Sequence, residues 1–243
     1  MHFLLSLVVL LVLGLRLEYS QSLPTFYTSA TCPYAARTAF LISVLEVPHE
    51  KVLIDLKDKP EDFLKVNPLG KVPSWRTDEG ECLYESLILN EYLCDSSTNA
   101  RANELLPSSP INRAKLRLSQ QRFDVLMSSF FKYFANVDPS LESSLESLLS
   151  SCLDALNGEL ESAGGYICGP TLTLTDVNCV PFFHRLLVGC NSKNYDVFNE
   201  RRVALRNWWD QIEGSEEWRR VRLEDDAIEE GLSRMKAMMS NRK

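Results

Sequence analysis

The sequence predicts an α/β domain followed by an all-helical domain, and three observations support this prediction. Residues 23–95 alternate short strand patterns with helical patterns. Residues 96–110 are rich in Ser, Asn and Pro, which is typical of a linker. Residues 111–243 have helical periodicity in almost every segment. A chain of 243 residues is long enough for either one large domain or two small ones.

The elements of the first domain follow one another as strand, helix, strand, hairpin and helix. The first strand ends at a turn that carries Cys32, and an amphipathic helix follows this turn. A second strand begins at Lys51 and leads into a short helix. After an acidic turn, a further strand ends near Tyr84, and a helix begins at Glu85 or Ser86. This order predicts a compact α/β unit of about 75 residues, a size at the low end for a domain.

Two local patterns stand out in the helical domain. Leucines recur at steps of three and four residues, which predicts one buried helix face that serves core packing and not a partner-binding zipper. The segment from Thr173 to Asp176 fits a capping box, in which each of the two residues bonds the backbone of the other. Because capping accounts for Asp176, we expect this carboxylate to support the fold and not to contact substrate. The periodic leucines are Leu141, Leu145, Leu148, Leu149, Leu153, Leu156 and Leu160.

The chain begins with an apolar leader in residues 1–22. Residues 3–15 form an apolar run of 13, whereas a membrane-spanning helix needs about 20 residues. This length fits the core of a signal peptide, with Ser20 and Ser22 as the best small residues for cleavage. The alternative is a buried extension of a cytosolic protein, so the sequence leaves a secretory or extracellular location and a cytoplasmic one open.

Composition argues against several classes of function. The 26 basic and 33 acidic residues give a net charge of −7, and no block of Lys or Arg occurs. Nucleic acid is therefore not expected as a partner, because phosphate binding requires a concentrated basic face. The seven cysteines are irregularly spaced, which argues against a disulfide scaffold, and the three histidines argue against a metal enzyme. We expect no metal site.

Cys32 is the best candidate for a nucleophile. It stands where a strand gives way to a helix, and Pro33 suits the first helical turn. Unpaired N–H groups and the helix dipole at such a position favour the reactive thiolate. The sequence continues through Tyr34 to Ala35 without a second cysteine, so a second thiol must come from a soluble cosubstrate. The alternative is an inert, half-buried thiol.

Three further positions are candidates for ligand binding. If the bond between Val72 and Pro73 is cis, the Val72 backbone could pair with an extended peptide; the alternative is a trans proline in an edge turn. Glu85 and Ser86, at the start of a helix, could receive an ammonium and a carboxylate, or could simply cap the helix. Lys59 could pair with another carboxylate, or could be an ordinary surface lysine.

Together these residues resemble the glutathione transferase superfamily and, within it, the omega class. The resemblance covers roughly residues 23–240 and implies a thioredoxin-like N-terminal domain and an all-helical C-terminal domain, the glutathione transferase fold. Where the omega pattern has an acidic residue, this chain has Ala36, while the Arg that follows remains at position 37. The most specific segments are TCPYAART, LKDKPEDFLKVNPLGKVPSW, LYESLILNEYL, LLPSSPINRAKLR and TLTLTDVNCVPFFHR.

The resemblance also implies a role for each candidate residue and a cosubstrate, glutathione. It implies an enzyme, a glutathione-dependent thiol transferase or reductase that needs no metal, and it implies a homodimer in the cytoplasm. The implied roles are catalysis by Cys32, an aromatic contact from Tyr34, pairing of Lys59 with the glycyl carboxylate, backbone pairing of Val72 before a cis Pro73 with the cysteinyl group, and binding of the γ-glutamyl end by Glu85 and Ser86.

Similar family members reduce protein–glutathione mixed disulfides, dehydroascorbate and methylated pentavalent arsenic, so we expect a small oxidised or disulfide substrate. Two alternatives remain open. One is a conjugating transferase that uses Tyr27 or Tyr34 in place of Cys32. The other is a non-enzymatic binding protein related to the chloride intracellular channel proteins. Candidates for the pocket of the second substrate are Phe130, Phe131, Trp208 and Trp209.

Overall fold

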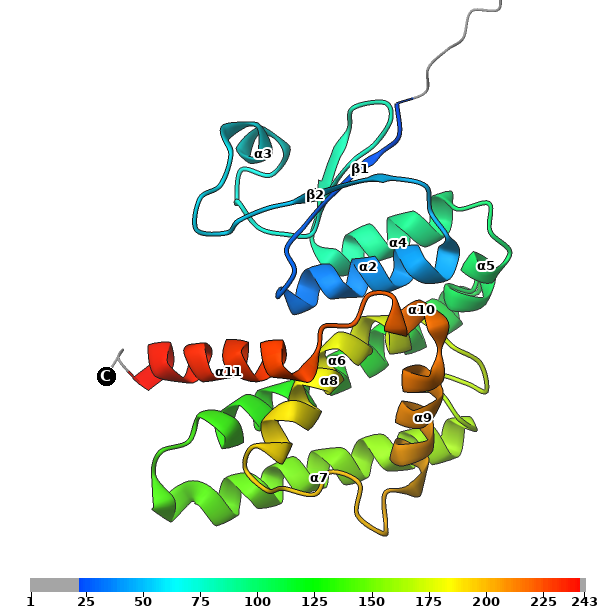
Figure 1. Ribbon diagram of the computed structural model, residues 1–243. Helices are drawn as coiled ribbons and strands as arrows, with labels where there is room; N and C mark the ends of the chain where they lie inside the picture. The colour runs from blue at the N-terminus through cyan, green and yellow to red at the C-terminus, as the bar shows by residue number, and fades with distance from the viewer. Residues whose placement is uncertain (1–21, 241–243) are drawn as a thin grey trace, which may run out of the picture.

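The computed structural model describes residues 22–240, and the leader expected at residues 1–22 lies almost entirely outside them. An α/β unit is followed by a helical unit, as the sequence predicts (Figure 1). No helix within the described range is long and apolar enough to cross a bilayer. The first unit contains β1 (Thr25–Thr28), α2 (Pro33–Leu45), β2 (Glu50–Leu53), α3 (Glu61–Val66), β3 (Ser74–Arg76), β4 (Cys82–Tyr84) and α4 (Ser86–Ser96).

The sheet has four strands in the order β2-β1-β3-β4. β1 pairs in parallel with β2 and antiparallel with β3, which in turn forms an antiparallel hairpin with β4. Because side chains alternate along β1, Phe26 belongs to the large core that includes α2 and α4, whereas Tyr27 packs with Phe63 of α3. Figure 1 shows α2 and α4 side by side on one face of the sheet, with α3 away from them.

The remaining helices form the C-terminal unit. The segment 96–110, expected to be a linker, contains the short helix α5. Helices α6 and α7 pack along each other, and α8 packs on α6 and also on α2 of the first unit. These helices are α5 (Arg101–Leu105), α6 (Pro110–Ala135), α7 (Pro139–Ala163), α8 (Leu174–Asn191), α9 (Val203–Gly214), α10 (Glu216–Arg219) and α11 (Asp225–Ser240).

The predicted leucine face of α7 is buried only in its later part. Leu149 and Leu153 are fully buried, but Leu141 and Leu148 are 49% and 44% exposed. The prediction of one continuous buried face was therefore wrong for the first half of the helix. Arg202 and Leu205 bond α7 at Ser150 and Asn157, in its later part, whereas the start of α7 meets the chain before α9 through the ion pair of Lys193 with Glu142.

A capping box begins α8, as predicted. The buried Asp176 carboxylate accepts hydrogen bonds from the Thr173 backbone N–H at 2.8 Å and from its hydroxyl at 2.6 Å. It also accepts bonds from the Ile167 N–H and the Trp208 indole, both at 2.9 Å. Burial raises the pKa of Asp176, and these hydrogen bonds oppose that effect. The carboxylate thus joins α8, α9 and the loop before α8.

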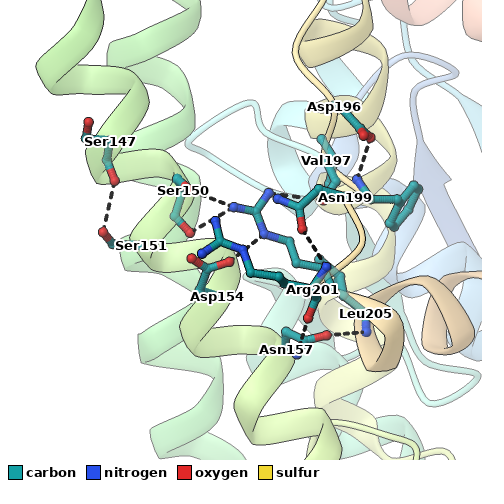
Figure 2. Close-up of polar contacts among 12 residues, drawn as sticks. Ser147, Ser150, Ser151, Asp154, Asn157, Asp196, Val197, Asn199, Arg201 and Leu205 are labelled. Carbon is teal, nitrogen blue, oxygen red and sulfur yellow. Dashed lines mark hydrogen bonds and ion pairs between the residues drawn. The ribbon is translucent and has the colours of Figure 1, made fainter.

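A buried arginine fixes the loop before α9 onto α7. Arg202 is 1% exposed, and its Nε donates to Asp154 Oδ1 at 2.7 Å. Its other nitrogens donate to the Ser150 hydroxyl at 2.6 Å and the Val197 carbonyl at 3.1 Å. Next to it, the first turn of α9 donates from the Leu205 N–H to Asn157 of α7 (Figure 2). The charge of this arginine therefore has a carboxylate partner and a complete set of acceptors.

Candidate active site

Cys32 is the residue immediately before α2, with Pro33 at the first helical position. Its backbone is extended, with φ −80° and ψ 118°, and its side chain makes no capping hydrogen bond to the helix. The half-buried sulfur lies 3.6 Å from the carbonyl oxygen of Val72. No side-chain hydrogen bond caps this first turn, so the sulfur stands beside an uncapped helix start.

The Val72–Pro73 peptide bond is cis, and the loop before it is held by a buried amide. Asn67 Nδ2 donates to the Lys71 carbonyl at 2.8 Å and to the Ser74 hydroxyl at 3.0 Å. Its Oδ1 accepts the N–H of Leu69 at 3.0 Å. These three bonds fix the backbone that stands beside the Cys32 sulfur, so Val72 presents a defined edge to the cleft.

Lys59 lies over the same loop at Gly70. A Cβ atom at position 70 would stand 3.0 Å from Lys59 Cδ and 3.1 Å from Nζ, and φ there is +59°. A glycine at this position therefore gives both the left-handed backbone and the room that the lysine needs. The ammonium group is thereby placed at the rim of the cleft.

Glu85 and Ser86 form the start of α4, as predicted. Glu85 has a positive φ of 71°, a strained conformation for a residue with a side chain, and such strain is concentrated at functional sites. Ser86 is buried, and its hydroxyl accepts a hydrogen bond from Arg37 Nη1 at 3.4 Å. The start of α4 thus offers free N–H groups for an anion, next to a carboxylate for a cation.

One cleft of about 500 Å³ joins all of these positions. The structure brings together every site residue that the sequence predicts. It adds residues that sequence reasoning missed, since nothing in a single sequence distinguishes Lys71 from a surface lysine or Asn67 from a turn residue. The lining residues are Cys32, Tyr34, Leu56, Lys59, Asn67, Gly70, Lys71, Val72, Pro73, Glu85 and Ser86.

The C-terminal unit contributes to this site through α8. Tyr34 is 53% exposed, and its ring packs edge-on against Phe182 with centroids 5.0 Å apart. The buried Arg37 guanidinium lies over the Phe182 ring at 4.1 Å and donates from Nε to the Asn178 carbonyl at 2.6 Å. Burial lowers the pKa of Arg37. The sequence identifies Arg37 only as a motif residue, because its partners Ser86 and Asn178 lie 49 and 141 positions away.

A second buried arginine, Arg185 of α8, reaches the backbone next to Cys32. Its Nη2 donates to the Thr31 carbonyl at 2.9 Å, and its Nη1 donates to the Pro181 carbonyl at 2.7 Å. Burial lowers its pKa to about 10, and Cys32 is the titratable neighbour that opposes this shift. The sequence segment that carries Arg185 gives no sign of this role.

The aromatic residues proposed for the second substrate do not line the cleft. Phe130, Trp208 and Trp209 are buried in the core of the helical unit, and Phe131 packs beside Phe130. Phe130 packs on Phe134, and Trp208 and Trp209 pack on Phe183 of α8, so these rings do not reach the cleft that contains Cys32. Phe182 is the aromatic residue of the helical unit that reaches Tyr34.

The remaining chemically active groups lie away from the cleft. Burial raises the pKa of Cys94 and Cys190 to about 12, which leaves both thiols protonated. His184 is buried and hydrogen-bonds Asp225 Oδ1 at 2.7 Å through Nε2, in line with a core histidine. Within residues 22–240, no three His, Cys, Asp or Glu side chains are arranged to hold a metal ion.

Comparisons with known proteins show which chains this one is similar to. Residues 31–96 match the family described as glutathione S-transferase, N-terminal domain. Glutathione S-transferase omega-1 of Mus musculus is 29% identical over 164 residues, which are 66% of this chain and 65% of that protein. The alignment thus spans slightly less than two thirds of the relative.

Solved structures share the fold. Glutathione transferase Omega 3C from Trametes versicolor superposes with a TM-score of 0.74 at 22% identity, covering 88% of this chain and 92% of that one. Dehydroascorbate reductase from Chlamydomonas reinhardtii gives 0.70 at 20% identity, covering 88% and 99%. The chain therefore has the glutathione transferase fold that the sequence predicts, with a thioredoxin-like first domain, and it resembles the omega class of that superfamily.

Proposed function

We propose that this protein is a glutathione-dependent thiol transferase or reductase that acts through Cys32. The observation that carries the proposal is the position of this thiol, uncapped at the start of α2 and in a cleft whose other walls suit a tripeptide. The names of the relatives, omega glutathione transferases and a dehydroascorbate reductase, support the same class of activity.

In this proposal glutathione lies along the cleft with its two ends held by opposite charges. Lys59 binds the glycyl carboxylate, and the Val72 backbone pairs with the cysteinyl group in the manner of an added strand. Glu85 binds the ammonium of the γ-glutamyl end, while Ser86 and the start of α4 bind its carboxylate. Tyr34 covers the tripeptide from the side of the helical unit.

The proposed reaction consists of two thiol–disulfide exchanges. The Cys32 thiolate attacks the glutathione sulfur of a mixed disulfide, forms a Cys32–glutathione disulfide and releases the other thiolate, which takes a proton from water. A second glutathione thiolate then attacks the glutathione sulfur bound to Cys32. This step forms oxidised glutathione and restores the Cys32 thiolate. In sum, one free glutathione reduces one mixed disulfide, and the oxidised glutathione contains the glutathione half of the substrate and the incoming glutathione.

The geometry favours Cys32 over the tyrosines of the conjugating alternative. Tyr27 is buried against Phe63 and packs toward α3, so its ring belongs to the core and not to the cleft. Tyr34 does line the cleft, with its ring against Phe182. A conjugating enzyme would have to use Tyr34, and turnover of a model electrophile in a Cys32→Ala variant would favour that alternative.

We also propose a small oxidised or disulfide compound as second substrate and a homodimer as the assembly. Both follow from the resemblance. Sedimentation of the purified chain tests the homodimer, and a monomer at micromolar concentration would contradict it.

The test of the proposed function replaces single cysteines. Cys32→Ser should abolish the reduction of a glutathione mixed disulfide, whereas Cys82→Ser, a half-buried thiol in the same domain but outside the cleft, should not. Mass spectrometry should find a glutathione adduct on the peptide that contains Cys32. Glutathione-dependent reduction that survives in the Cys32→Ser variant would refute the proposal.

A further inference from the structure

The side chain of Arg185 in the helical unit contacts the backbone immediately before Cys32. It stands on α8 and is 8% exposed. Its Nη2–H donates to the carbonyl of Thr31, which is covalently joined to Cys32. Its Nη1–H donates to the Pro181 carbonyl on its own helix, so the planar guanidinium is held at both ends.

The charge of Arg185 has no carboxylate partner among the described residues. Both of its hydrogen bonds end on neutral carbonyl oxygens. Burying a cation in this way costs free energy unless a negative group compensates it. Because Nη2 bonds the residue before Cys32, the Cys32 sulfur is a nearby group that can compensate this charge when it becomes a thiolate.

Other charged groups also face Cys32, and they do not replace Arg185. Arg37 of α2 is the second buried cation, and its hydrogen bonds go to the Asn178 carbonyl and the Ser86 hydroxyl, away from the turn before Cys32. Lys59, Lys71 and Glu85 line the same cleft with exposed side chains, so water screens their charges. Arg185 differs from these groups because it is buried and donates to the backbone joined to Cys32.

We propose that Arg185 is a positioning residue for the reaction, which holds the turn before Cys32 in place and stabilises the Cys32 thiolate from the helical domain. This inference rests on the proposed function for its catalytic meaning. Its physical content, the charge and placement of the thiol, can be measured without glutathione or a second substrate.

The experiment measures the rate at which iodoacetamide alkylates Cys32 as a function of pH, followed by mass spectrometry of the Cys32 peptide. Arg185→Met removes the cation and both hydrogen bonds at similar length. We expect the pH of half-maximal alkylation to rise by about one unit, which lowers the rate below that pH about tenfold, because one nearby opposite charge is lost. Near-ultraviolet circular dichroism checks that Arg185→Met is folded. If it is not, Arg185→Gln, which also removes the charge, is measured in its place.

Two controls separate this effect from a general loss of stability. Arg185→Lys keeps the charge without the two-pronged geometry, so it should recover the parent's alkylation rate to within about threefold. Arg202→Met makes the same substitution at a buried arginine on the other side of the helical unit, and it should leave the Cys32 profile unchanged. An unchanged profile in Arg185→Met, or an equal shift in Arg202→Met, would overturn the inference.

A second readout links the inference to turnover. In the reduction of a glutathione mixed disulfide, Arg185→Met should lower kcat about tenfold and change the KM for glutathione less than about twofold. A shifted alkylation profile in a protein without reductase activity would support the inference and refute the proposed function. Normal reductase activity of the parent, with an unchanged alkylation profile in Arg185→Met, would support the proposed function and refute the inference.

Discussion

Arg202 and Arg185 are both buried arginines of the helical unit, and their partners differ. Arg202 donates to the carboxylate of Asp154, which stands 43% exposed at the surface of α7. Arg185 donates only to carbonyl oxygens, and its charge faces a thiol. Arg202 therefore fixes a loop through a compensated charge, whereas in our proposal the uncompensated charge of Arg185 serves the Cys32 thiolate. The comparison contrasts an arginine with a carboxylate partner and one without.

The largest expected effect is a loss of activity without a loss of stability, and it concerns Cys32, the group that faces Arg185. Cys32→Ser should lower the rate of glutathione-dependent reduction by at least about a thousandfold, because serine is not ionised at neutral pH. Its unfolding free energy should change by less than about 0.5 kcal/mol, since the sulfur makes one weak hydrogen bond. Turnover assays and denaturant unfolding check both values, and a large loss of stability would show that Cys32 also supports the fold.

The next effect is a loss of stability without a change at Cys32, and it concerns Arg202. Arg202→Ala should lower the unfolding free energy by about 3 kcal/mol, because it leaves Asp154, Ser150 and the Val197 carbonyl without their donor. Alkylation of Cys32 in the folded variant should not change. Thermal unfolding measures the first value, with Arg206→Ala, an exposed arginine on α9, as the control that loses little stability. A stability equal to that of the parent would contradict the structural assignment.

A smaller effect sharpens the picture of the cleft. Ser86→Ala removes the hydroxyl that accepts from Arg37 and that we place at the γ-glutamyl carboxylate. The KM for glutathione should rise about tenfold, the value of a hydrogen bond to a charged group. The rate of Cys32 alkylation should stay within about twofold of the parent. Steady-state kinetics measure the KM, and an unchanged value would place the γ-glutamyl end elsewhere.

The smallest effect concerns His184, the neighbour of Arg185 that faces α11. Burial, with help from Arg185 and Arg222, lowers its pKa, while the hydrogen bond to Asp225 opposes the shift. The unfolded chain therefore binds more protons, and the contribution of His184 to stability is present above its ordinary pKa and is lost as the pH falls through the lowered value. Stability should fall more steeply toward acid pH in the parent than in His184→Gln. Parallel slopes would contradict this.

Local patterns predicted most of the fold because they act between neighbours in the chain. The junction at Cys32, the hairpin turn from Thr77 to Glu81 and the capping box at Thr173 each depend on residues within four positions of one another. The cleft followed from the same junctions, since the ends of β1, β3 and β4 meet at one side of the sheet. Sequence alone could therefore locate the cleft.

Features that depend on packing between distant helices could not be predicted in this way. Arg185 and Thr31 are separated by 154 positions, and only the docking of α8 on α2 brings them together. For the same reason, Leu148 fits the helical period of a buried face and is nevertheless exposed. Phe130 is aromatic, as residues that bind substrates often are. Its ring packs between Phe134 of α6 and Gly189 of α8, however, and so belongs to the core.

The contact between Arg185 and Thr31 has a consequence for how such proteins can be recombined. The family match ends at residue 96, long before α8 begins, so the segment that identifies the chain does not contain the whole environment of its sulfur. Grafting the first domain onto another helical half would carry Cys32 along and leave Arg185 behind. If Arg185 acts as we propose, chimaeras of this kind should differ in acidity at Cys32 even when the grafted residues are identical.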